Sequence, residues 1–170
     1  MIVRDSINQM SIAYVRMETN RLFLSIPIPE KINEIFEEKI ASYHHIKAKW
    51  IAKEKRHITL LFIGKKSKEE TAALDALIKE KTEKLASFYL TFDSISFFPS
   101  ERAPQMIWAR FCTSPQFVHL SAAFAEALNK KEDHETIPHV TLARLKSQQP
   151  LQLHFPQLEL LVYLSTTLIL

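Results

Sequence analysis

The sequence predicts a single α+β domain, and three observations support that prediction. Short runs of β-forming residues alternate along the 170 residues with stretches that repeat apolar residues at helical spacing. The composition, 46% hydrophobic and 24% charged, is that of an ordinary globular domain. The chain has one glycine, Gly64, which excludes the glycine-rich loops of Rossmann and P-loop proteins.

The first half of the chain predicts two strand–helix units. A strand is expected over Arg21 to Ile28, and a helix follows from Pro29 to about Tyr43. A second strand over His57 to Ile63 ends at Gly64, which permits a positive φ, and residues 67–70 form a capping box for a second helix. The apolar residues at helical spacing are Ile32, Ile35, Phe36 and Ile40, then Ala73, Leu74, Leu77, Ile78 and Leu85.

The second half repeats this alternation. Strands are expected over Phe88 to Phe97 and Met106 to Cys112, and Ser114 with Pro115 then caps and starts a helix. A charged loop leads to a strand over His139 to Leu145, and a last strand covers about Leu158 to Ser165. The apolar stripe of the helix consists of Phe117, Leu120, Phe124 and Leu128.

Residues 1–20 match none of these elements, so we expect a poorly ordered N-terminal extension before one domain over residues 21–170. The N-terminus lacks the pattern of a signal peptide, and the longest apolar stretch is too short to span a bilayer. We therefore expect a cytoplasmic protein without membrane contact, and a monomer. The lone Cys112 excludes a disulfide framework and a thiolate-built zinc site, and we expect it to be buried.

Basic residues concentrate in one place, although the net charge is only +3. Residues 47–56 (KAKWIAKEKR) contain five basic side chains and one Glu. Such a run is usually a solvated face. Because it lies immediately before the strand that starts at His57, it is also a candidate contact for an RNA backbone.

A tetrapeptide pattern occurs twice, once in each half. One predicted strand reads His57-Ile58-Thr59-Leu60, and another reads His139-Val140-Thr141-Leu142. A bare His-x-Thr triplet is a weak signal, and the chain has a third one at residues 134–136. That triplet lacks the β-branched residue and the following Leu, so the two full motifs are far more specific than the triplet alone.

Strand geometry gives this spacing a chemical meaning. Side chains alternate along a strand, so each His and its Thr lie on one face while the apolar residues enter the core from the other. If the halves are related by a pseudo-twofold axis, the two His/Thr pairs meet. One neutral imidazole can then remove a proton and one charged imidazole can donate one, while hydroxyls bind phosphate oxygens. This set suits phosphodiester chemistry.

Two other interpretations stay open at this point. His and Thr can be ordinary strand residues, which is the more common case for a single copy. A metal site is the second alternative, but two His without clustered Cys or paired carboxylates form a poor ligand set. The duplicated, in-phase arrangement favours a catalytic role, with no metal and no cofactor.

Three segments carry a resemblance to a known family. RLFLSIPIP, HITLLFIG and PHVTLARLK resemble the RNA 2′,3′-cyclic phosphodiesterases of the LigT-like group, in the two-histidine (2H) phosphoesterase superfamily. The similarity runs in order from about Arg21 to Ser165. It implies two similar lobes, each an antiparallel sheet backed by helices, with both HxTx motifs in a central groove.

The resemblance also implies an activity and a role for each residue. It implies metal-independent hydrolysis of RNA 2′,3′-cyclic phosphate ends to 2′-phosphomonoesters, and an association with 2′,5′ RNA ligation. His57 would be the proton donor to the 3′ oxygen, and His139 the proton acceptor that activates water. Thr59 and Thr141 would hold the phosphate.

Other residues are candidates for substrate contact. Arg144 is an attractive anion contact, but its parity along a regular strand is opposite to that of His139, so it would point away. Trp50 and Trp108 could stack on a base, although large aromatics near strands are more often core residues.

We therefore expect a phosphoesterase acting on RNA or nucleotides with 2′,3′-cyclic phosphate ends. The alternative is a noncatalytic nucleotide-binding or RNA-binding module that uses the same residues. A pure binder would have no need for two titrating imidazoles.

Overall fold

The computed structural model describes residues 2–3, 13–14, 21–82, 87–130, 137–146, 155 and 161–164. These residues form nine strands, three α-helices and two short 3₁₀ helices. The strands are β1 (Ile2–Val3), β2 (Ala13–Tyr14), β3 (Arg21–Pro27), β4 (Ala48–Trp50), β5 (His57–Lys65), β6 (Phe88–Phe98), β7 (Met106–Phe111), β8 (His139–Leu145) and β9 (Leu161–Leu164). The helices are α1 (Glu30–Ile40), η1 (Ala41–Tyr43), η2 (Lys53–Lys55), α2 (Lys68–Thr82) and α3 (Pro115–Ala127).

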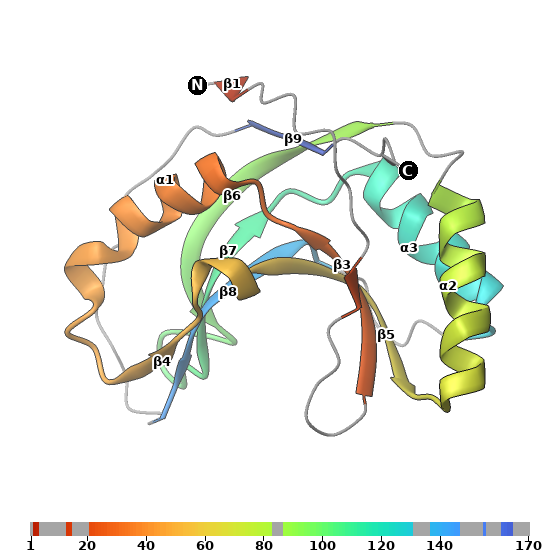
Figure 1. The fold of residues 1–170 in the computed structure, drawn as a ribbon. Coiled ribbons are helices and arrows are strands. Elements are labelled where there is room, and N and C mark those ends of the chain that lie inside the picture. Colours follow the sequence, from red (N-terminus) through yellow and green to blue (C-terminus); the bar gives the residue numbers. More distant parts are fainter. Residues whose placement is uncertain are drawn as a thin grey trace.

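The strands of the described chain form one sheet in the order β1-β9-β6-β7-β8-β5-β3-β2, and β4 pairs with β8 beside β5. The pairs are antiparallel except for β1 with β9. Figure 1 shows the sheet bent into an arch, with α1 outside one limb and α2 and α3 outside the other. The predicted α+β class is therefore confirmed.

The local signals in the sequence form the expected caps. The Ser67 hydroxyl accepts from the Glu70 amide at 3.2 Å, and the Glu70 carboxylate accepts from the Ser67 amide at 2.8 Å, so α2 begins with a capping box. The Ser114 hydroxyl accepts from the Phe117 amide at 3.2 Å to cap α3. Gly64 has a φ of +87°, but the expected turn is wrong: Gly64 lies inside β5, which ends at Lys65, and it is paired with Leu22 beside a register shift of the kind a β-bulge makes.

The core lies between the helices and the convex side of the sheet. Phe36 on α1 is fully buried, and its ring lies 6.1 Å from Phe92 and 6.4 Å from Phe111. On α3, the buried Ser121 hydroxyl donates to the Leu60 carbonyl of β5 at 2.9 Å. The stripe expected on α2 is partly wrong, because Ala73 is exposed while Leu74 and Ile78 are buried.

Some local expectations are corrected. Strand β4 lies inside the basic run, where three residues in a charged segment gave no strand signal. Cys112, expected to be buried, is exposed. The expected extension over residues 1–20 lies largely outside the described residues, and its two described pieces are β1 and β2, which pair with β9 and β3.

Two phenylalanines allow a matched test of this packing. Phe36→Ala should lower the free energy of unfolding by about 3–5 kcal/mol, because it leaves a cavity among buried rings. Phe62→Ala should change it by less than about 0.5 kcal/mol, since the Phe62 side chain is 72% exposed. Urea denaturation measures both variants. Similar losses for the two would contradict the core described here.

Candidate active site

The two HxTx motifs meet at one pair of strands. Strand β5 pairs with β8 through the antiparallel register Ile58↔Val140. In that register His57 lies beside Thr141, and Thr59 lies beside His139. The structure therefore brings both His/Thr pairs together at the junction of the two halves of the sheet.

The alternation expected from the sequence is present in both strands. Ile58, Leu60, Val140 and Leu142 are buried, whereas the two His and the two Thr are half-buried. The Thr141 hydroxyl lies 3.9 Å from the Met106 sulfur, a weak acceptor, and within the described chain the Thr59 hydroxyl has no partner. Two imidazoles and two hydroxyls thus share the face opposite the helices.

Each imidazole has its Nδ1 atom bonded to the backbone two residues earlier. His57 Nδ1 lies 2.8 Å from the Lys55 carbonyl oxygen, and His139 Nδ1 lies 2.8 Å from the Ile137 carbonyl oxygen. A carbonyl can only accept, so Nδ1 must carry the proton. Each neutral ring therefore leaves a basic Nε2, and each charged ring has an Nε2–H to donate.

An aromatic ring packs against each imidazole. The Phe23 ring stacks on His57 with centroids 4.8 Å apart and an interplanar angle of 25°. The Trp108 ring lies 4.9 Å from His139, and the Trp108 indole donates to Ser96 at 2.8 Å. Trp108 is buried, so it supports His139 instead of offering a free ring to a base. Trp50 is half-buried, with its ring 4.6 Å from His44.

Burial lowers the pKa of both histidines. Desolvation is the largest cause of the lowered pKa of His57 and of His139, because it disfavours the charged ring. The carbonyls of Lys55 and Ile137 act in the opposite direction and raise the two pKa values. The positive charge of Arg144 lowers both pKa values further, and His139 also lowers that of His57.

Arg144 faces the site, although regular alternation predicts the opposite. Ile107 pairs with Ala143 and Trp108 pairs with Thr141, so Leu142 is an extra residue in β8. Such a β-bulge shifts the parity of the residues that follow it. Arg144 therefore lies exposed on the face of His139, which is consistent with its effect on both imidazole pKa values.

The same bulge occurs in the first motif. Leu24 pairs with Leu61 and Ser25 pairs with Thr59, so Leu60 is the extra residue in β5. Phe62 then takes the position that Arg144 has in β8, and the Phe62 side chain is 72% exposed. Its ring lies 6.1 Å from the Phe23 ring that stacks on His57. Sequence reasoning missed Phe62 because the bulge gives no local signal.

The basic residues of the run 47–56 differ in their exposure and in their partners. Arg56, expected among the exposed cations, is instead buried, with 2% of its side chain exposed. Lys53 lies 3.9 Å from Glu30 of α1. Lys49, on β4, is exposed and pairs in register with Arg144.

The described residues contain no group of three or more His, Cys, Asp or Glu residues that could hold a metal ion. In the same part of the chain, no helix has both the length and the apolar character needed to cross a bilayer.

The chain is similar to known proteins in sequence and in fold. The 2′-5′ RNA ligase superfamily matches residues 29–168. An RNA 2′,3′-cyclic phosphodiesterase of Archaeoglobus fulgidus is 26% identical over 136 residues, which cover 76% of this chain and 75% of the relative.

Solved structures share the fold. The crystal structure of TT0787 of Thermus thermophilus aligns with a TM-score of 0.71 and 24% identity, covering 85% of this chain and 84% of that one. Escherichia coli LigT, crystallised with NADP⁺, aligns with a TM-score of 0.67 and 21% identity, covering 85% and 83%. The resemblance to LigT-like proteins is thus confirmed, and the chain belongs to the 2′-5′ RNA ligase superfamily.

Proposed function

We propose that this protein hydrolyses 2′,3′-cyclic phosphate at RNA ends to a 2′-phosphomonoester by acid–base catalysis. The observation that carries the proposal is the pairing of the two HxTx strands in one register, with Nε2 of each imidazole making no hydrogen bond to the described residues. The curated relative described above, named RNA 2′,3′-cyclic phosphodiesterase, supports this choice of substrate.

The proposed reaction is one in-line displacement at phosphorus. Neutral His139 accepts a proton from water at Nε2 as the water oxygen bonds to phosphorus. Protonated His57 donates its Nε2 proton to the 3′ oxygen as the bond from phosphorus to that oxygen breaks. The 2′ ester remains, and proton exchange with solvent returns both imidazoles to their starting states.

Charge develops on the nonbridging oxygens during this step. In the proposed mechanism the hydroxyls of Thr59 and Thr141 donate to those oxygens, and Arg144 supplies a positive charge on the same face. The exposed ring of Phe62 is a better candidate for stacking on a nucleobase than Trp50 or Trp108, which are at least partly covered.

The same residues can act on another nucleophile. If a 5′ hydroxyl replaces water, His139 takes its proton, the 3′ oxygen leaves, and the product contains a 2′,5′ phosphodiester. We propose hydrolysis as the main reaction in dilute solution, because water is present in large excess over any 5′ hydroxyl.

Removal of either imidazole tests the catalytic assignment. His57→Ala and His139→Ala should each lower kcat on a nucleoside 2′,3′-cyclic phosphate by about 10²-fold or more, through loss of the general acid or base. Thr59→Val and Thr141→Val should cause smaller losses. The control is His119→Ala, which removes an exposed imidazole from α3. Binding without turnover in the unmodified protein would favour the noncatalytic alternative.

The pH profile tests the protonation states. Catalysis needs neutral His139 and charged His57, so kcat/KM should be bell-shaped in pH. Because both pKa values are lowered from 6.5, the rate should already fall as pH rises through 6.5 and His57 loses its proton. Arg144→Gln should shift the profile to higher pH, because it removes a positive charge that lowers both pKa values.

Chelation tests whether catalysis is independent of metal, and activity should survive EDTA. An EDTA-sensitive rate restored by a divalent ion would contradict the proposal.

Lys49 tests contact with the RNA backbone. Like charges on directly opposite strand residues repel, so the pairing of Lys49 with Arg144 favours an anion between or above them. Lys49→Gln should weaken binding of an oligonucleotide with a cyclic phosphate end, and should reduce its salt slope by about 0.7. Turnover of a cyclic mononucleotide should be affected less, because Arg144 and both His/Thr pairs remain. The control Lys31→Gln removes an exposed charge from α1. Equal salt slopes for both variants would exclude Lys49 from the interface.

A further inference from the structure

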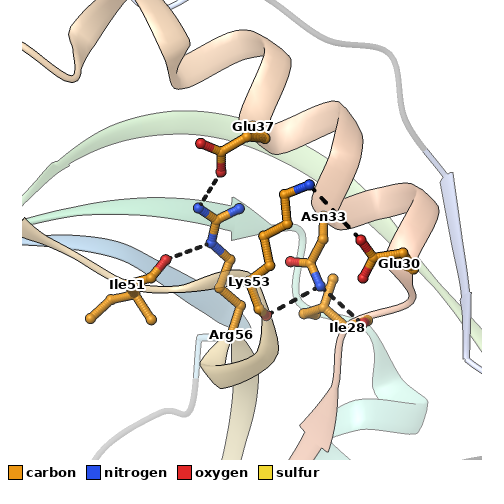
Figure 2. A network of polar contacts seen from close by, with 7 residues as sticks. All are labelled: Ile28, Glu30, Asn33, Glu37, Ile51, Lys53 and Arg56. Carbon is orange, nitrogen blue, oxygen red and sulfur yellow. Dashed lines mark hydrogen bonds and ion pairs between the residues drawn. The ribbon is translucent and has the colours of Figure 1, made fainter.

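A buried arginine lies next to the first candidate catalytic histidine. The Arg56 guanidinium donates from Nη2 to a Glu37 carboxylate oxygen at 2.7 Å and from Nε to the Ile51 carbonyl at 3.1 Å (Figure 2). Glu37 belongs to α1, and its second oxygen lies 3.3 Å from His44. Arg56 therefore connects the start of β5 with the helix that covers the sheet.

The turn before His57 is held by the same group of residues. The Arg56 amide donates to the Lys53 carbonyl at 3.1 Å. The buried Asn33 of α1 donates from Nδ2 to that carbonyl at 3.4 Å and to the Ile28 carbonyl at 3.3 Å. Helix η2 is thus connected to α1 through the Lys53 carbonyl, which accepts from Asn33, and through the Arg56 side chain, which donates to Glu37. The Lys55 carbonyl, which accepts from His57, belongs to this turn.

Ile51 extends the connection to the second motif. Its carbonyl accepts from Arg56, while its amide donates to the Leu142 carbonyl at 2.8 Å. Leu142 is the bulged residue that directly follows Thr141. One residue thus links the backbone before His57 to the strand that presents His139.

Stability alone is a weak explanation for this arginine. Burying an ion pair costs desolvation that its Coulomb attraction often fails to offset, and apolar residues of similar size are often as stable. Within the described chain, Nη1 of Arg56 is buried without a hydrogen-bond partner, which adds to that cost. The directional contacts to Ile51 and Glu37 are what an apolar residue could not supply.

In the second motif, the backbone before the histidine is restrained in a different way. Pro138 precedes His139, and its ring fixes φ at that position. The Pro138 carbonyl accepts from the Phe111 amide at 2.9 Å, and the Ile137 carbonyl accepts from His139. Arg56 occupies the corresponding position before His57, where φ is −77°. There, the Arg56 side chain adds its contacts to the backbone hydrogen bond from the Arg56 amide to the Lys53 carbonyl.

We propose that Arg56 is the positioning residue of His57: its contacts to Glu37 and Ile51 hold the Lys55 carbonyl against Nδ1, which keeps Nε2 of the imidazole directed at the substrate. The effect on titration is expected to be larger at His57 than at His139, whose carbonyl partner belongs to another turn. His57 faces His139 and Arg144 of β8, whose charges lower its pKa, and the Lys55 carbonyl, which raises it. Release of that carbonyl should therefore lower the pKa of His57 further.

The first experiment is an NMR titration of the histidine rings without substrate. In Arg56→Met, which keeps an apolar stem of similar length, the His57 pKa should fall and its Nε2–H tautomer should appear in the ¹⁵N shifts. His139 is the internal control, because its carbonyl partner belongs to another turn. Lys53→Gln, a matched charge removal in η2, should leave both rings unchanged.

Kinetics supply the second readout, which rests on the proposed function. Arg56→Met should lower kcat for a cyclic mononucleotide by roughly 10- to 100-fold, because a misplaced catalytic group loses rate steeply. KM should change much less, and Arg56→Lys should restore part of kcat. Because the titration needs no substrate, a wrong assignment of the substrate would leave its result intact.

Two outcomes would overturn the proposal. One is a folded Arg56→Met protein whose His57 pKa and tautomer match the unmodified protein. The other is an equal shift at His57 and His139, which would indicate general loosening of the sheet. If Arg56→Met fails to fold, Glu37→Gln provides the same test, since it removes the charge of the partner and leaves the arginine in place. No shift at His57 in that variant would also contradict the proposal.

Discussion

The arrangement of the site depends on one short contact, the pairing of Ile58 with Val140. This pair joins β5 to β8, and with them the two halves of the sheet. Because neighbouring residues point to opposite faces, burying these two side chains forces the flanking His and Thr residues to the other face. A slip of one residue in either strand would turn the imidazole of that strand into the core, so the hydrophobic effect itself specifies the site.

Each imidazole experiences two opposing effects. Packing against Phe23 or Trp108 and the surrounding protein removes water, which favours the neutral ring. The carbonyl at Nδ1 favours the charged ring and also selects the tautomer. Burial is the larger effect at both positions, so the pKa of each ring is lowered and the neutral form is favoured. The carbonyl at Nδ1 keeps Nε2 oriented.

The sequence predicted the parts of the fold that depend on local patterns. The spacing of apolar residues predicted the order of strands and helices and the shared face of each His/Thr pair. Capping chemistry predicted the caps at Ser67 and Ser114. The bulges at Leu60 and Leu142 depend on how neighbouring strands pair, so the orientations of Phe62 and Arg144 could not be predicted. The burial of Arg56 likewise depends on Glu37, which lies on a separate helix.

The matching bulges have a consequence for how a substrate can lie in the site. They turn residues at equivalent positions toward the same face, yet one of these residues is an apolar ring and the other a guanidinium. The two imidazoles and their carbonyl partners are nearly equivalent, so in the proposed mechanism they do not by themselves distinguish the two ends of a nucleotide. The difference between Phe62 and Arg144 breaks that equivalence. Which imidazole acts as acid would then be decided by the direction in which the bound ribose lies, and the same pair of histidines could exchange roles when a reaction runs in reverse.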